Sequence, residues 1–356
     1  MTQLGESRVR QLVLLGSGPT HRRLLHRLAR RPLPALRVAL LAAHPHTVQP
    51  SRVPALITGQ SAPHTAALGI LDLAGQSGVR VLAHRATAID YGARALTLEN
   101  GDQLAYDLLS LDPDTVQDRA ALDAAMPGAR EHGLFVLPVE AFATLWPRVV
   151  GLPAERLRSL VVLGAGVLAV EIAFALRQRL PQCAISLVSG VGGFLRGEPE
   201  RLQAAVRHAL QRATINLLED EVLSIRAGML QLGCGADLVC DVPLIATEPS
   251  WPAWLLQSGL LLDGAGKNVS TDACLRASGH QDVFVAPDDA GIAVARTLHA
   301  NLERLLNVKP LRPPGALQPA LRFADLGQRR AVLTWHAWCV QGHAVWRLKQ
   351  WRELAG

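Results

Sequence analysis

Two short glycine-rich segments contain the residue types that bind the phosphates of a nucleotide. The first is Gly16-Ser17-Gly18-Pro19 and the second is Gly164-Ala165-Gly166-Val167. Each follows an aliphatic run that predicts a buried strand, and each precedes a pattern that predicts a helix. A glycine turn in this context presents backbone N–H groups and the positive end of a helix dipole to a pyrophosphate. The two turns therefore predict two nucleotides, most simply a flavin and a nicotinamide.

The residues of the first turn have separable roles. Gly16 permits the tight turn out of the strand, and Gly18 lets the backbone approach a pyrophosphate. A helix that begins near Pro19 directs its N–H groups at the same phosphates. His21 follows in this helix, where it could lie beside the nucleotide without a catalytic role or could only cap the helix. For either turn alone, tight packing of a strand against a helix is the alternative to nucleotide binding.

The second turn repeats the arrangement. Gly164 and Gly166 take the two glycine positions, Val167 opens the helix, and the small Ala169 allows close packing between helix and strand. Neither of the strands that follow the two turns ends in a carboxylate that could bind a ribose 2′-hydroxyl. The sequence therefore leaves NADH and NADPH open as alternatives.

The hydrophobic pattern predicts alternating strands and helices around both turns. The expected elements are strands at 11–15, 36–41, 160–163 and 184–188, with helices at 21–31 and 169–179. This order predicts an α/β fold with two Rossmann-like three-layer domains, each built on a parallel sheet.

The later segments predict how the chain divides into domains. A strand at 283–286 and a helix at 291–306 resemble the end of the first domain, so we expect the second domain to be inserted in the first. The expected domains are a discontinuous FAD-binding type at 1–118 and 270–308, an NAD(P)-binding type at 119–269, and a small α+β appendage at 309–356, which follows a proline-rich linker.

Composition excludes several classes of function. The net charge of +6 arises from 36 basic and 30 acidic residues that are scattered along the chain, and aromatic residues make up only 4%, so we expect no nucleic-acid binding. No stretch has membrane-spanning length and the N-terminus has no signal-peptide pattern, which predicts a cytoplasmic protein. Five cysteines without a C-x-x-C pair predict neither a zinc site nor an adjacent-cysteine redox disulfide, and we expect no metal.

Several segments together resemble a known family over nearly the whole chain. The sequence looks like the FAD-dependent pyridine nucleotide-disulfide oxidoreductase superfamily, near type II NADH dehydrogenases and sulfide:quinone reductases. The group found fused or adjacent to selenide, water dikinase is the most similar. The segments that carry the resemblance are both glycine turns, Arg31-Pro32-Leu33-Pro34, Tyr106-Asp107-Leu108-Leu109-Ser110-Leu111, Ser258-Gly259-Leu260, Val283-Phe284-Val285-Ala286 and Trp346-Arg347-Leu348-Lys349.

The resemblance implies cofactors and residues that bind them. FAD would bind at the first turn with further contacts from Thr87, Asp288 and Ala290, and the Asp288 carboxylate would accept hydrogen bonds from the ribityl hydroxyls. NADH or NADPH would bind at the second turn, where Glu171 matches the acidic position of the family. The alternatives are an N-cap for the acidic pair that includes Asp288 and a local helix contact for Glu171. No catalytic acid or base is identified.

The resemblance also implies an activity and partners. Hydride would pass from the nicotinamide to the flavin and then to a small-molecule acceptor, either a quinone or a sulfur or selenium species. A selenophosphate synthetase-type protein is an expected partner. The competing hypothesis is an accessory or binding module that kept the fold and lost FAD.

Departures from the family pattern favour the competing hypothesis. Pro287 stands where relatives have glycine, and Glu248 puts a carboxylate near the place that the nucleotide would approach. Ser110-Leu111-Asp112-Pro113-Asp114 replaces a glycine-bearing turn, and Pro50-Ser51-Arg52-Val53-Pro54-Ala55 departs from the stretch that would border the isoalloxazine. Most of these changes lie around the expected flavin.

The C-terminal segment has the amphipathic mixture of an interface. Four tryptophans lie close to basic residues in it: Trp335, Trp338, Trp346 and Trp351. Such a segment could contact a membrane surface, cover a flavin domain or form a homodimer contact. Membrane association is the less favoured of these alternatives.

Overall fold

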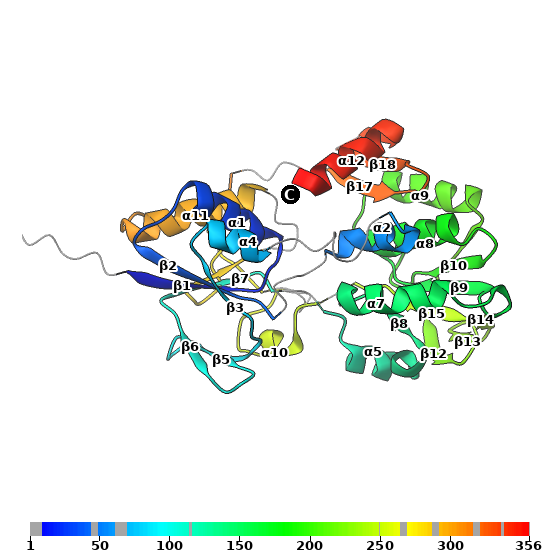
Figure 1. The fold of residues 1–356 in the computed structure, drawn as a ribbon, viewed down its shortest axis with the longest axis horizontal. Helices are drawn as coiled ribbons and strands as arrows, with labels where there is room; N and C mark the ends of the chain where they lie inside the picture. Colours follow the sequence, from blue (N-terminus) through cyan, green and yellow to red (C-terminus); the bar gives the residue numbers. More distant parts are fainter. Residues whose placement is uncertain are drawn as a thin grey trace, which may run out of the picture. The chain divides into compact units, whose positions relative to one another are not determined.

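The computed structural model describes residues 9–43, 49–60, 70–113, 116–248, 250–263, 269–286, 292–315, 321–335 and 338–355. The chain forms two compact units. Unit 1 comprises Met1–Thr47, Leu68–Thr115 and Trp251–Gln318, and unit 2 comprises Val48–Ala67, Val116–Ser250 and Pro319–Gly356. Both units are therefore built from segments that are distant in the sequence (Figure 1).

In its described part, unit 1 is built on a five-stranded parallel sheet in the order β16-β7-β1-β2-β3. Its strands are β1 (Arg10–Leu15), β2 (Leu36–Leu41), β3 (Arg80–Leu82), β7 (Leu108–Leu111) and β16 (Val283–Val285). Aliphatic side chains of α1 (Pro19–Arg30), α4 (Ile70–Gln76) and α11 (Ile292–Leu306) pack on one face of this sheet. Figure 1 shows these helices together on one side of the sheet.

A second, antiparallel sheet lies against the opposite face. It consists of β4 (Ala86–Asp90), β5 (Ala95–Leu98) and β6 (Gln103–Ala105), and α10 (Ala253–Leu256) joins the same hydrophobic cluster. Because both faces of the parallel sheet are covered, its strands are almost continuously apolar. This apolar pattern is why the strands could be predicted from the sequence. The expected strand at 36–41 matches β2, and the helix expected at 291–306 matches α11 within one residue.

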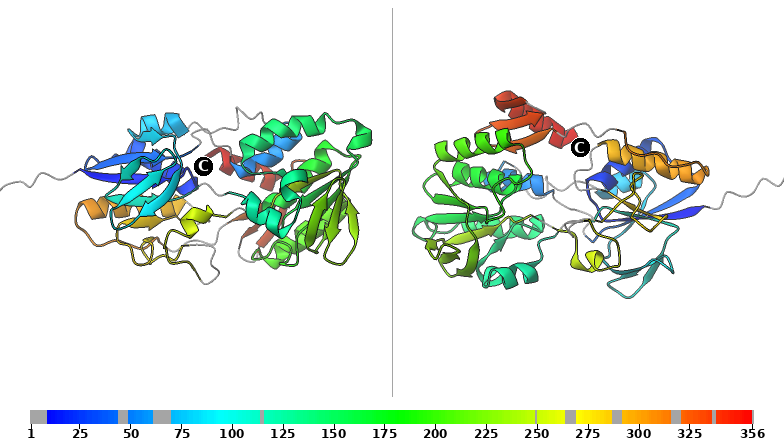
Figure 2. Two further views of the ribbon diagram at one scale, coloured as in Figure 1. Left: turned by 90° about the horizontal axis from the view of Figure 1, so that it is seen from below. Right: turned by 180° about the vertical axis from the view of Figure 1, so that it is seen from behind.

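Unit 2 repeats this plan with its own sheet, in the order β11-β10-β9-β15-β8. Each neighbouring pair of strands is parallel, and the strands are β8 (Leu134–Phe135), β9 (Ser159–Leu163), β10 (Ala184–Val188), β11 (Ile215–Leu218) and β15 (Val242–Ile245). Helices α7 (Val139–Val150), α8 (Val167–Arg179) and α9 (Glu200–Arg212) pack on one face. The antiparallel strands β12 (Val222–Arg226), β13 (Met229–Leu232) and β14 (Asp237–Val239), preceded in the chain by α5 (Arg119–Ala125) and α6 (Ala129–His132), lie on the other. Two views of the ribbon in Figure 2 show the layers.

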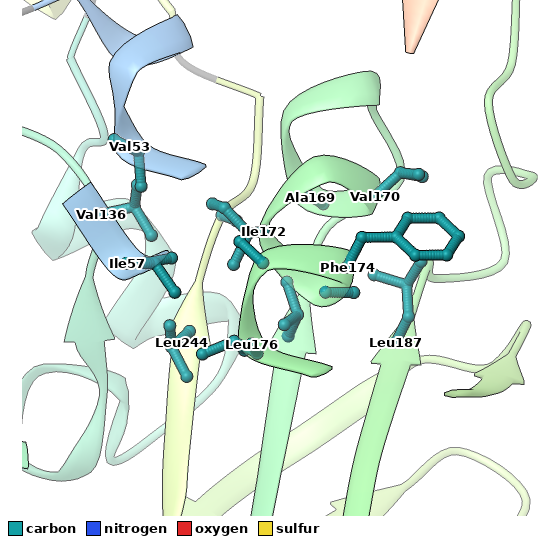
Figure 3. Close-up of a cluster of buried hydrophobic side chains, with 14 of the residues drawn as sticks. Val53, Ile57, Val136, Ala169, Val170, Ile172, Phe174, Leu176, Leu187 and Leu244 are labelled. Carbon is teal, nitrogen blue, oxygen red and sulfur yellow. The ribbon is translucent and has the colours of Figure 1, made fainter. Parts of the chain in front are cut away.

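A short segment from the first fifth of the chain completes the core of unit 2. The turn η1 (Pro50–Arg52) and helix α2 (Val53–Thr58) bring fully buried Val53 and Ile57 into the cluster that contains Ile172 and Leu176 of α8. Figure 3 shows these side chains converging. The family resemblance places residues 50–55 at the stretch that would border the isoalloxazine, and in the structure they belong to unit 2, with Val53 in its core.

The C-terminal segment also packs in unit 2. Strands β17 (Arg322–Asp325), β18 (Ala331–Trp335) and β19 (Trp338–Gly342) form an antiparallel sheet, and α12 (His343–Ala355) follows it. Ala324 and Val332 are fully buried in the same cluster as α8, while α12 lies against β18 and β19. A 3-10 turn, η2 (Ala154–Arg156), precedes β9.

Candidate functional site: two glycine turns with different surroundings

The second glycine turn opens on a cavity of about 380 Å³ within unit 2. Strand β9 ends at Leu163, the turn follows, and α8 begins at Val167 with Gly166 as its N-cap, which makes no side-chain capping bond. The first N–H groups and the positive dipole end of α8 are therefore available to an anion. Other residues that line the cavity are Leu168, Glu198, Ala246, Thr247, Glu248, Leu321, Arg322 and Phe323.

The close packing of this turn explains its small residues. A Cβ atom at Gly164 would overlap the backbone of Ala246, and it would stand 3.0 Å from the Ala169 methyl group. A Cβ atom at Gly166 would stand 3.6 Å from the nearest carboxylate oxygen of Glu248, which is ordinary van der Waals contact. Gly164 is thus required by the fold, whereas Gly166 leaves space on the cavity side.

The charges around the cavity are mixed. Glu248 lies beside the first turn of α8, at the level where a pyrophosphate would bind. Glu198 forms an ion pair with Arg322 of β17, with 3.8 Å between the carboxylate Oε2 and the guanidinium Nε. The open turn and the dipole of α8 favour an anion, whereas the Glu248 carboxylate beside Gly166 would repel it.

The first glycine turn is closed by Asp112, the residue that follows β7. The Asp112 side chain accepts a hydrogen bond from the backbone N–H of His21 (2.8 Å), and its backbone oxygen accepts one from Gly18 N–H (3.2 Å). Gly16 has a φ of 91°, and a Cβ atom there would overlap the Asp112 backbone. A Cβ atom at Gly18 would overlap the Asp112 carboxylate itself. The position of the pyrophosphate therefore contains a carboxylate of the chain, and FAD does not fit there.

His21 contributes to this closure from the first turn of α1, which begins at Pro19. Its ring is fully buried; Nδ1 lies 2.8 Å from the Gly16 oxygen and Nε2 lies 2.8 Å from Ser110 Oγ. The ring thus links the turn to β7. These ring contacts do not cap the helix, and a position of His21 beside a nucleotide stays a prediction.

The other residues predicted for FAD are dispersed or outside the described residues. Thr87 is exposed on β4, and its hydroxyl donates to the Thr97 oxygen across the β4–β5 pair (3.3 Å). Asp288 and Ala290 lie outside the described residues, as does Pro287. Their roles stay predictions.

Glu171 has an ion-pair partner that sequence reasoning did not find. Its Oε1 lies 2.9 Å from Lys349 Nζ on α12 and accepts a hydrogen bond from the Asp325 N–H (2.8 Å). Both side chains of the pair are at least nine-tenths buried. Burial raises the pKa of the Glu171 carboxyl, and the Lys349 charge opposes this effect. Only the fold brings residues so distant in the chain together, so the sequence offered no local signal for the pair.

The remaining sequence expectations concern cysteines, metals and membranes. All five cysteines are free thiols. In the described ranges, no group of three His, Cys, Asp or Glu side chains could hold a metal ion. Within those same ranges, no helix is both long and apolar enough to cross a bilayer.

The C-terminal sheet and α12 expose large aromatic side chains. Trp338 is 71% exposed and Trp351 is 66% exposed, while the Trp346 ring is tilted against the His343 ring, with 5.6 Å between the ring centroids. The predicted interface character of this segment therefore corresponds to accessible tryptophan surface in unit 2.

Two parallel sheets, each with a glycine turn that joins a central strand to the next helix (β1 to α1 and β9 to α8), define a protein with two dinucleotide-binding-type domains. Residues 10–302 match the family model described as pyridine nucleotide-disulphide oxidoreductase. The match covers most of the chain, so this protein belongs to that oxidoreductase family, whose members use FAD and NAD(P)H. No curated protein matches the sequence.

Solved structures of the same fold support the assignment. The sulfide:quinone oxidoreductase of Aquifex aeolicus superposes with a TM-score of 0.77 at 16% identity, covering 97% of this chain and 90% of that one. NDH2 of Plasmodium falciparum, solved with NADH, gives 0.77 at 12% identity, covering 96% and 94%. A NAD-dependent persulfide reductase from A. fulgidus gives 0.71 at 16% identity, covering 91% and 63%. At these identities the likeness establishes the fold.

Proposed function

We propose that this chain is an NAD(P)H-dependent oxidoreductase whose unit 2 binds the nicotinamide dinucleotide across the N-terminus of α8. The observation that carries the proposal is the cavity at Gly166, which leaves the first turn of α8 open to an anion. Gly164, Val167 and Ala169 would shape the turn, and the α8 dipole would stabilise the pyrophosphate. The nicotinamide ring of the bound dinucleotide would then supply the hydride.

We also propose a class of electron acceptor. A quinone or a sulfur or selenium species would accept the reducing equivalents, which is supported by the resemblance of the sequence and by the names of the sulfide:quinone oxidoreductase and the persulfide reductase. The selenophosphate synthetase-type partner and the cytoplasmic location are supported by the sequence alone. A homodimer or a membrane surface would use the exposed tryptophans of the C-terminal segment.

A second candidate is a nucleotide-binding accessory module that works without FAD. The specific observation in its favour is the Asp112 carboxylate at the first turn. Both candidates share the NAD(P)H site of unit 2 and differ in whether the protein itself transfers electrons.

The test follows NADH and NADPH oxidation anaerobically with a short-chain quinone or a polysulfide, with and without added FAD. The enzyme hypothesis predicts loss of the nicotinamide absorbance with at least one acceptor and none with the Gly166→Val variant. Nucleotide binding without any turnover would favour the accessory module. Absence of both binding and turnover would contradict the proposed site.

A further inference from the structure

We infer that Asp112 takes the place of the FAD pyrophosphate in unit 1, so that the wild-type chain does not retain FAD at its first glycine turn. This inference concerns unit 1 and does not depend on the function proposed for unit 2. It rests on a comparison of the two glycine turns at the residue that closes over each of them, Asp112 in unit 1 and Ala246 in unit 2.

The strand before each turn makes a matching backbone contact with the residue that follows the neighbouring strand, β7 in unit 1 and β15 in unit 2. In unit 1 the Asp112 N–H donates to the oxygen of Leu15, at the end of β1 (3.0 Å). In unit 2 the Ala246 N–H donates to the oxygen of Leu163, at the end of β9 (2.8 Å). A Cβ atom on the first glycine of either turn would overlap the backbone oxygen of this same residue. Asp112 and Ala246 are therefore equivalent positions.

The two turns differ in the side chain at this position. Ala246 has only a methyl group, and it lines the open cavity before α8. Asp112 extends a carboxylate over Gly18 to the N–H of His21, the third residue of α1, where it acts as a cap supplied from another strand. Gly18 has no side chain to make this bond, and α1 has no acidic residue in its first turn. The Asp112 carboxylate thus satisfies the helix end that would otherwise bind phosphate.

Charge adds to the steric conflict. Asp112 is only 8% exposed, and its carboxylate lies over Gly18, where a Cβ atom would overlap Oδ1. A pyrophosphate that approaches Gly18 would therefore have to displace this carboxylate. The phosphates would have to displace it from the His21 N–H or remain close to a like charge. For a carboxylate about 4 Å from two phosphate charges, repulsion even at the dielectric constant of water corresponds to a loss of affinity of about thirty-fold.

The experiment measures FAD binding to full-length wild type and to the Asp112→Ala variant, which makes unit 1 resemble unit 2 at this position. We expect the purified wild type to contain no flavin, and Asp112→Ala to bind added FAD at least about thirty-fold more tightly by fluorescence quenching titration. FAD should also raise the melting temperature of the variant but not that of the wild type.

A second variant separates charge from folding. Asp112→Asn keeps an acceptor for the His21 N–H and removes the charge, so it should remain folded and gain part of the affinity. Wild-type protein that purifies with stoichiometric FAD would overturn the inference. It would also be overturned if neither folded variant bound FAD more tightly than wild type, since Asp112 would then not be the excluding group.

Discussion

The Glu248→Gln substitution should strengthen NAD(P)H binding in unit 2. Glu248 is exposed and lies beside Gly166, at the end of α8 where the pyrophosphate would bind. Two unit charges about 6 Å apart repel by about 0.7 kcal/mol at the dielectric constant of water. Because a pyrophosphate carries two charges, the total is about 1.4 kcal/mol, which corresponds to about ten-fold in Kd before screening by salt.

Isothermal titration with NADPH and NADH at two ionic strengths measures this effect. The Debye length is about 10 Å at 0.1 M salt, so the gain should approach ten-fold in dilute buffer and shrink as salt is added. The matched control is Glu155→Gln, an exposed carboxylate in η2, before the opposite end of β9, which should change Kd by less than about two-fold. An unchanged or weaker affinity in Glu248→Gln would refute the placement of the pyrophosphate beside Gly166.

Three further outcomes are expected. Ala246→Asp should close the second turn as Asp112 closes the first and should abolish NAD(P)H binding, measured by the same titration with circular dichroism to confirm folding. Lys349→Met should lower the free energy of unfolding by about 3–5 kcal/mol in urea at pH 7, because it leaves the buried Glu171 charge unpaired, and Glu171→Gln in the same chain should restore part of the loss. Burial raises the pKa of Glu171 in the folded state, so the folded Lys349→Met variant binds a proton that the unfolded chain releases. Its loss of unfolding free energy relative to wild type should therefore shrink as the pH falls towards the unfolded-state pKa of about 4.3. A loss that grows as the pH falls would be inconsistent with this sign. Burial raises the pKa of Cys240 to about 12, so iodoacetamide at pH 8 should label exposed Cys234 and leave Cys240 unmodified until the protein unfolds, which peptide mass spectrometry can follow.

The parallel sheets could be predicted from the sequence because their strands are buried on both faces. The aliphatic runs before each glycine turn have no polar interruption, and they became β1 and β9 with boundaries within one residue of the expectation. The helices that follow were expected at 21–31 and 169–179 and begin two residues earlier, at Pro19 and Val167.

Contacts between segments that are distant in the chain could not be predicted from the sequence. The placement of α2 beside α8 depends on packing of Val53 and Ile57 against residues more than a hundred positions later, and no local pattern encodes it. The Glu171–Lys349 pair depends in the same way on where the C-terminal sheet packs.

Asp112 is an intermediate case. The sequence showed that Asp112-Pro113-Asp114 departs from a glycine-bearing turn, which indicated a change near the flavin. It did not show that the carboxylate reaches the His21 N–H, because that contact depends on how closely the end of β7 approaches the turn after β1.

Both candidate functions require that the second glycine turn binds NAD(P)H. A titration of wild type and Gly166→Val with NADPH and NADH tests it most directly, because the extended backbone at Gly166 accepts a branched side chain whose Cβ would meet only ordinary contacts. We expect saturable binding of one dinucleotide per wild-type chain and none by a Gly166→Val protein of unchanged melting temperature. Equal affinity in the two proteins, or no binding by wild type, would contradict it.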